Sequence, residues 1–201
     1  MAAADERQRQ RLMLASNTCL LTGPVPSSGL WWAYCHSVAA EGDTAFVVCE
    51  RRRLERGGAG PSLTPGCAPK APAWQRVALR YVDSAQEAAR VLLSVHELAP
   101  PPRVLVLDVD WAALLPPGRG AEAARLAGLL LSALLGAGRQ MACIVACDAE
   151  SEPLLRRYVP HVLQLSSAGS LHVLQVEQSP AHAKVRFTIS NANLLQLHSV
   201  I

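Results

Sequence analysis

The chain has 201 residues, of which 50% are hydrophobic and 17% are charged, and its formal net charge at pH 7 is +3. This length fits one domain with an ordinary core, and the hydrophobic fraction excludes an intrinsically disordered protein. The mild positive charge permits nucleic-acid binding but does not predict it. Since no apolar run is long enough for a signal peptide or a membrane span, we expect a soluble intracellular protein that has no membrane partner.

Apolar segments and helix-like segments alternate from residue 17 onward. Five strand-like segments, rich in apolar residues, lie at residues 18–22, 44–50, 76–81, 103–110 and 139–148. Helical spacing of apolar residues predicts helices at residues 29–42, 84–98 and 120–138. Strands that are apolar throughout and joined by helices predict an α/β fold, with a mostly parallel sheet covered by helices on both faces.

The last sixty residues follow a different pattern. Short segments with period-two character lie at residues 161–167, 171–179, 183–190 and 194–200, separated by turn residues. They predict an antiparallel β extension at the C-terminal side of the parallel sheet. We therefore expect a single domain over residues 17–201, preceded by an N-terminal helix or tail at residues 1–16. A Gly- and Pro-rich stretch at about 56–74 predicts one long mobile loop.

The stretch "LLTGPVPSSGL" has the layout of a phosphate-binding P-loop, with an apolar strand, a glycine turn and then a helix. The full motif is G-x-x-x-x-G-K-[ST]. Counted from Gly23, Ser28 replaces the second glycine, Gly29 replaces the lysine and Leu30 replaces the hydroxyl residue. Losing the lysine costs roughly ten- to a hundred-fold in affinity, because one charge-assisted hydrogen bond is worth about 1.5–3 kcal/mol. We predict a degenerate, vestigial nucleotide site at Gly23, Ser27, Ser28 and Gly29 that binds no cofactor, with ATP as the alternative.

In the segment "RVLVLDVDW", four apolar residues are followed by Asp108. This is the Walker B pattern, in which the aspartate helps to hold magnesium. The alternative is a carboxylate that finishes a strand as an ordinary loop residue. We add Asp108 to the degenerate nucleotide site, where it has neither the lysine nor the hydroxyl as a partner.

The segment "ERRRLER" places Arg51, Arg52, Arg53 and Arg56 at the mouth of the long loop. Such a cluster predicts contacts to the phosphate backbone of DNA. The alternative is a solvated loop in which two glutamates compensate the arginines.

Six cysteines are scattered without C-x-x-C spacing, which predicts reduced, buried thiols and no metal site. Cys143 and Cys147 are four residues apart on a predicted strand, so they face the same side. Trp31 and Trp32 follow the P-loop-like turn. They are expected to pack in the core or against a partner, with stacking on a base as the alternative.

Five segments taken together resemble the core of the RecA-type recombinases. They are "LLTGPVPSSG", "TAFVVCERRRL", "RVALRYVDSAQEAARVLLSVHE", "RVLVLDVDW" and "LLRRYVPHVLQL", and they are spread from about residue 18 to 165. Within that family the chain resembles the small ATPase-like paralogues that accompany a SWIM-domain zinc-finger protein in the Shu complex. The resemblance rests on the order and the spacing of these segments.

The resemblance implies a RecA-like fold and a nuclear accessory protein. It further implies a heterodimer with a SWIM-domain zinc-finger protein, which supports the recombinase filament on single-stranded DNA in homologous recombination. The missing lysine and hydroxyl indicate a subunit without catalysis. Phe46 and Phe187 are followed by "VVC" and "TIS", so neither begins the Phe-x-x-Ala segment with which recombinases dock on each other. The alternatives are a weak ATPase in which Asp108 still organises magnesium, and a RecA-fold scaffold in an unrelated assembly such as Elongator.

Overall fold

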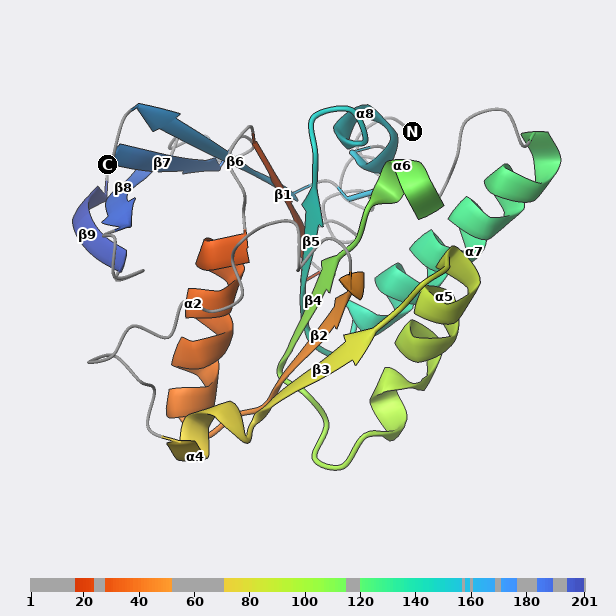
Figure 1. Cartoon of the computed structure of the whole chain (residues 1–201), viewed down its shortest axis with the longest axis horizontal. Helices are drawn as coiled ribbons and strands as arrows, with labels where there is room; N and C mark the ends of the chain where they lie inside the picture. Colours follow the sequence, from red (N-terminus) through yellow and green to blue (C-terminus); the bar gives the residue numbers. More distant parts are fainter. Residues whose placement is uncertain are drawn as a thin grey trace, which may run out of the picture.

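The structure is a computed structural model. It describes residues 17–23, 28–51, 71–114, 120–156, 158–159, 161–168, 171–176, 184–189 and 195–200. These residues form one nine-stranded sheet with helices on both faces (Figure 1). The predicted N-terminal helix or tail at residues 1–16 lies outside the described residues.

Each of the five strand-like segments forms a strand, as predicted. The strands are β1 (Thr18–Thr22), β2 (Ala45–Cys49), β3 (Val77–Tyr81), β4 (Val104–Asp108) and β5 (Ala142–Cys147). The four period-two segments form β6 (His161–Ala168), β7 (Leu171–Val176), β8 (Lys184–Ile189) and β9 (Leu195–Val200). The strand order is β3-β2-β4-β5-β1-β6-β7-β8-β9. The predicted α/β class, mostly parallel with an antiparallel extension, is confirmed.

The sequence did not predict how the extension joins the parallel part of the sheet. β6 pairs in parallel with β1, from Cys19 opposite His161 to Thr22 opposite Gln164, and it pairs antiparallel only with β7. It therefore closes the parallel part of the sheet, and the antiparallel extension comprises β7, β8 and β9. Period two marks a strand with one solvated face, but it does not say in which direction the neighbouring strand runs.

Helices cover both faces of the sheet, as predicted. The described helices are α2 (Ser28–Ala40), α4 (Ala71–Trp74), α5 (Ala85–Ser94), α6 (Trp111–Leu114), α7 (Gly120–Ala137) and α8 (Glu152–Leu155), and a 3-10 turn, η1 (Val95–Glu97), follows α5. α5 and α7 contribute Leu92, Leu130 and Leu134 to one core cluster, whereas α2 contributes Trp31 and Trp32 to the cluster on the opposite face. Figure 1 shows α2 on one side of the sheet, opposite α5 and α7.

The start of α5 follows from its sequence. The Ser84 hydroxyl accepts a hydrogen bond from the Glu87 backbone N–H at 3.2 Å, and the Glu87 carboxylate accepts one from the Asp83 backbone N–H at 3.1 Å. Ser84 and Glu87 thus bond to the backbone on both sides of the helix start, in the manner of a capping box.

The predicted loop at about 56–74 overlaps α4 in its last four residues. Pro72 stands in the first turn of α4, where a proline ring costs no hydrogen bond. The α4 segment is fixed by Trp74, whose ring lies edge-on to Trp32 with 5.5 Å between the ring centroids. Residues 52–70 of the predicted loop lie outside the described residues.

The described cysteines are all free, and all but Cys19 are buried. Cys143 and Cys147 belong to the same core cluster, so the prediction that they face one side is confirmed. Burial raises the pKa of the Cys143 thiol to about 12. Within the part of the chain that the structure describes, no helix is both long and apolar enough to cross a membrane.

Candidate nucleotide site at the carboxyl edge of the sheet

The candidate site is formed where four parallel strands end together. Asp108 at the end of β4 is opposite Cys49 in β2 and Ala146 in β5, and Thr22 at the end of β1 is opposite Cys147. In open α/β sheets, ligands bind outside the carboxyl ends of the strands. The parallel register therefore brings Thr22 and Asp108 to the same edge, although they lie far apart in the sequence.

The first glycine of the P-loop-like segment is explained by packing alone. Gly23 has φ +155°, and a Cβ atom on it would lie 2.0 Å from the backbone oxygen of Leu165 in β6. No other residue fits this position without moving the β6 backbone. Gly23 therefore allows close contact between neighbouring strands, and its presence requires no phosphate. Of the other predicted loop residues, Ser28 and Gly29 begin α2, whereas Ser27 lies outside the described residues.

Asp108 accepts a hydrogen bond from the indole of Trp31. The distance from Trp31 Nε1 to Asp108 Oδ2 is 3.2 Å, and the two residues are 0% and 5% exposed. In P-loop proteins, the hydroxyl residue of the loop and the Walker B aspartate hold magnesium together. Here Leu30 stands at the hydroxyl position, and the next residue turns a donor-only indole N–H toward the aspartate. The residues present therefore do not fit a magnesium-nucleotide group.

A second acidic residue, Glu50, pairs with Asp108 through the backbone, and sequence reasoning missed it. Glu50 directly follows β2, its backbone N–H donates to the Asp108 carbonyl at 3.2 Å, and its carboxylate accepts from the Asp110 backbone N–H at 3.3 Å. Glu50 was interpreted only as a charge that compensates the arginines. Its position at a strand end was the available signal, but the pairing of β2 with β4 was needed to place it beside Asp108.

Glu152 adds a further carboxylate at the base of the loop. The buried Thr22 hydroxyl donates to Glu152 Oε2 at 2.8 Å, and Arg156 Nη1 lies 3.3 Å from Glu152 Oε1. Burial, and in second place the nearby Asp108 carboxylate, raise the pKa of the Cys49 thiol to about 12. Among the described residues, this edge holds the carboxylates of Asp108, Glu50 and Glu152, and Glu152 is paired with Arg156. Among the described residues, no group of three or more His, Cys, Asp or Glu is arranged to hold a metal ion.

Of the predicted DNA-binding arginines, the structure describes Arg51. Its side chain is exposed, and the guanidinium carbon lies 4.6 Å from the centroid of the Tyr81 ring. Arg52, Arg53 and Arg56 lie outside the described residues. Trp31 and Trp32 both pack in the core, with ring centroids 4.5 Å apart. Since Trp31 is fully buried, its ring is not available to stack on a base.

Comparison with known proteins agrees with this architecture. The sheet order, the helices on both faces and the antiparallel extension define a RecA-like α/β fold. The chain is similar to the solved structure of the RadB recombinase, with a TM-score of 0.64 and 18% sequence identity over 89% of this chain and 90% of that one. This likeness establishes the fold. Neither a protein-family model nor a curated protein sequence matches the chain.

Proposed function

We propose that the chain is a non-catalytic RecA-fold accessory subunit, which supports assembly of a recombinase filament on single-stranded DNA during homologous recombination repair. The observation that carries the proposal is the Trp31–Asp108 hydrogen bond, which engages the Walker B aspartate with a core side chain. The similarity of the fold to a recombinase supports the recombination pathway. The resemblance of five sequence segments to the accessory paralogues of the Shu complex supports the accessory role.

The proposed mechanism is binding without turnover. A protein shifts an assembly equilibrium only by as much as it binds the assembled state more tightly than the free components. A subunit that contacts the filament, but has no hydrolysis cycle of its own, stays bound as long as mass action favours it. It would stabilise the early filament, and it would not control when the filament disassembles.

The proposed partner is a SWIM-domain zinc-finger protein that forms a heterodimer with this chain in the nucleus. Affinity purification of the tagged chain from dividing cells, followed by mass spectrometry, tests this partner directly. Recovery of a SWIM-domain zinc protein together with recombination factors is the expected result. Recovery of neither would remove the Shu-type assignment and leave only the fold.

Nucleotide binding is tested by thermal denaturation with and without magnesium and ATP. A ligand at a hundred times its Kd stabilises a protein by about 2.7 kcal/mol, and we expect no such stabilisation here. The weak-ATPase alternative draws support from the position of Asp108 at the carboxyl end of a central parallel strand. Stabilisation by ATP that is lost in Asp108→Ala, in a variant that still folds, would establish that alternative and exclude a vestigial site.

A restoration series sharpens this test. Ser28→Gly, Gly29→Lys and Leu30→Thr together rebuild the loop motif, but they leave the Trp31 indole on Asp108. We expect this triple variant to bind magnesium-ATP only when Trp31→Phe is added, because phenylalanine keeps an aromatic ring in the core and removes the donor. Equal nucleotide binding with and without Trp31→Phe would show that the indole does not block the site.

The accessory role is tested with recombinase filaments on single-stranded DNA. We expect the purified heterodimer to increase the rate or the extent of filament assembly. Asp108→Asn, a variant close in shape, is expected to retain this effect because no hydrolysis is involved. Assembly that requires Asp108 in a folded heterodimer would overturn the non-catalytic mechanism.

A further inference from the structure

Arg51 and Tyr81 form a stacked pair at the exposed end of two neighbouring strands. Arg51 directly follows Glu50 after β2, and Tyr81 is the last residue of β3, in register with Cys49. The guanidinium carbon lies 4.6 Å from the ring centroid, within the range of a cation–π contact. Tyr81 is half-buried and packs against the core cluster on the α2 side of the sheet. The tyrosine is therefore anchored, and it holds an otherwise flexible arginine at the surface.

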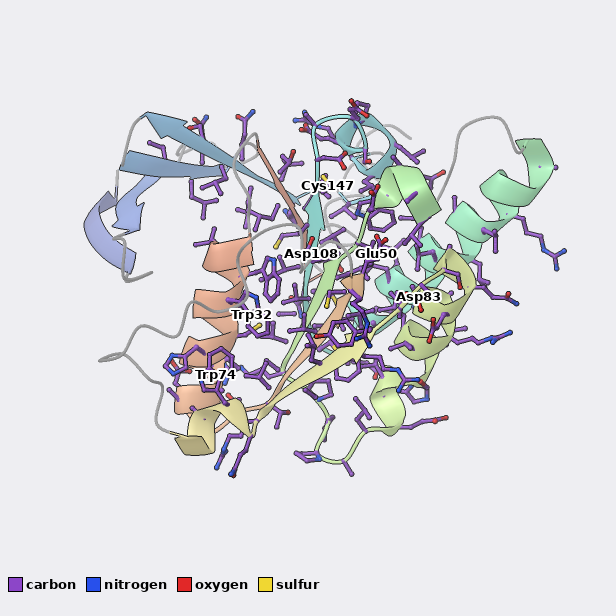
Figure 2. The ribbon with its side chains drawn as sticks, viewed as in Figure 1. Trp32, Glu50, Trp74, Asp83, Asp108 and Cys147 are labelled. Atoms are coloured by element: carbon purple, nitrogen blue, oxygen red, sulfur yellow. The ribbon has the colours of Figure 1, made fainter. Side chains whose placement is uncertain are left out.

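The stacked geometry of the pair indicates which part of a nucleic acid it suits. Charges of both signs lie near Arg51, since Glu50 precedes it, Arg80 precedes Tyr81, and Figure 2 shows the Asp83 carboxylate near the end of β3. Charge alone therefore does not select a phosphate group here. The guanidinium group is planar, stacks on aromatic rings, and is already held against one ring. This geometry favours contact with the flat face of a base over contact with the phosphate backbone.

We propose that Arg51, positioned by Tyr81, stacks on an unpaired base of single-stranded DNA. This inference rests on the proposed function, which supplies the single-stranded DNA, and it replaces the phosphate-backbone role predicted for Arg51 from sequence. Single-stranded DNA exposes its bases, and stacking on aromatic and arginine side chains is a general way to bind them. Tyr81 is a positioning residue, and the guanidinium group of Arg51 makes the contact.

The test measures binding of the full chain, in complex with its partner where one is required, to fluorescent dT25 and to an abasic oligomer of equal length. Arg51→Lys keeps the charge but removes the planar group, and Tyr81→Leu removes the support while keeping bulk. Both are expected to weaken binding to dT25 by roughly five-fold or more, which is the smallest loss of affinity expected when one stacked base loses its partner. Binding to the abasic oligomer and the salt dependence of binding should stay unchanged, because no phosphate contact is lost. Tyr81→Phe is expected to bind as the wild type does.

Arg90→Ala is the matched control, since it removes one exposed arginine from α5 on the other side of the sheet. Its affinity for dT25 is expected to be near that of the wild type. If Arg51→Lys binds dT25 as the wild type does while Arg51→Ala does not, the contact is with phosphate and the inference is wrong. Wild-type binding that is equal for dT25 and the abasic oligomer overturns it as well. Either outcome leaves the accessory role to the filament assay, so the two failures are distinguishable.

Discussion

Replacing Trp31 with phenylalanine removes one hydrogen-bond donor and leaves an aromatic ring in the core. The lost bond joins Trp31 Nε1 to the 5%-exposed Asp108 carboxylate, and a hydrogen bond to a charged group is worth about 1.5–3 kcal/mol. The substitution also shortens a buried side chain, so the raw loss of stability combines two effects. The neighbouring tryptophan separates them.

Trp32→Phe is the matched control. Trp32 is 8% exposed, it contacts the rings of both Trp31 and Trp74, and its Nε1 has no hydrogen-bond partner within the described part of the chain. The control therefore loses similar packing and no hydrogen bond. We expect Trp31→Phe to lower the free energy of unfolding by roughly 1.5–3 kcal/mol more than Trp32→Phe does. For a chain of this size, a difference of about 2 kcal/mol corresponds to roughly 4–8 °C in Tm.

The assay is urea denaturation followed by far-UV circular dichroism, because tryptophan fluorescence changes with the substitutions themselves. Trp31→Phe, Asp108→Ala and the double variant complete a cycle, in which residues in direct contact couple by about 0.5–3 kcal/mol. Equal destabilisation by the two Trp→Phe substitutions, or a coupling near zero, would refute the assignment of the indole as the partner of Asp108. The degenerate site would then lose the contact on which the proposed function rests.

Three further predictions concern the same fold. Gly23→Ala is expected to lower the free energy of unfolding by about 2 kcal/mol or more, because its Cβ would lie 2.0 Å from the β6 backbone. Gly128→Ala in α7, where no atom lies within 4 Å of the new Cβ, should raise it by roughly 0.5–1 kcal/mol. Urea midpoints compare the two variants, and equal effects would contradict the packing argument. Thr22→Val removes the 2.8 Å hydrogen bond to Glu152 and should lower the free energy of unfolding by roughly 1–3 kcal/mol, while Thr22→Ser should retain most of the stability in the same assay. If the two variants are equally stable, the hydrogen bond contributes nothing. Burial raises the pKa of the Cys35 thiol to about 12 from an ordinary 9.0. Between these pH values the thiol is ionised in the unfolded chain and protonated in the folded chain, so the free energy of unfolding falls as pH rises. The fall should be shallower in Cys35→Ala, and an identical pH profile would argue against the raised pKa.

The sequence by itself determined the strands and the three long helices, but not the short helices α4, α6 and α8. Continuous apolar runs located β1 to β5, and β1 spans Thr18–Thr22 as predicted. The capping box at Ser84 and Glu87 located the start of α5. These features depend on side chains close together in the chain, because periodicity and capping act over one or two turns. The departure of Gly29 and Leu30 from the P-loop pattern could likewise be read without a structure, since that motif is contiguous.

Only the tertiary structure decided how the strands are ordered and what meets at their ends. The parallel pairing of β6 with β1 could not be predicted from period two, because that pattern reports solvation of a face and carries no information about the direction of a neighbour. The bonds from Trp31 to Asp108 and from Thr22 to Glu152 join residues 77 and 130 positions apart. Such contacts depend on the strand order and on which face of the sheet each helix covers. The sequence therefore named Asp108 as a candidate, and the fold showed that a tryptophan of α2 engages it.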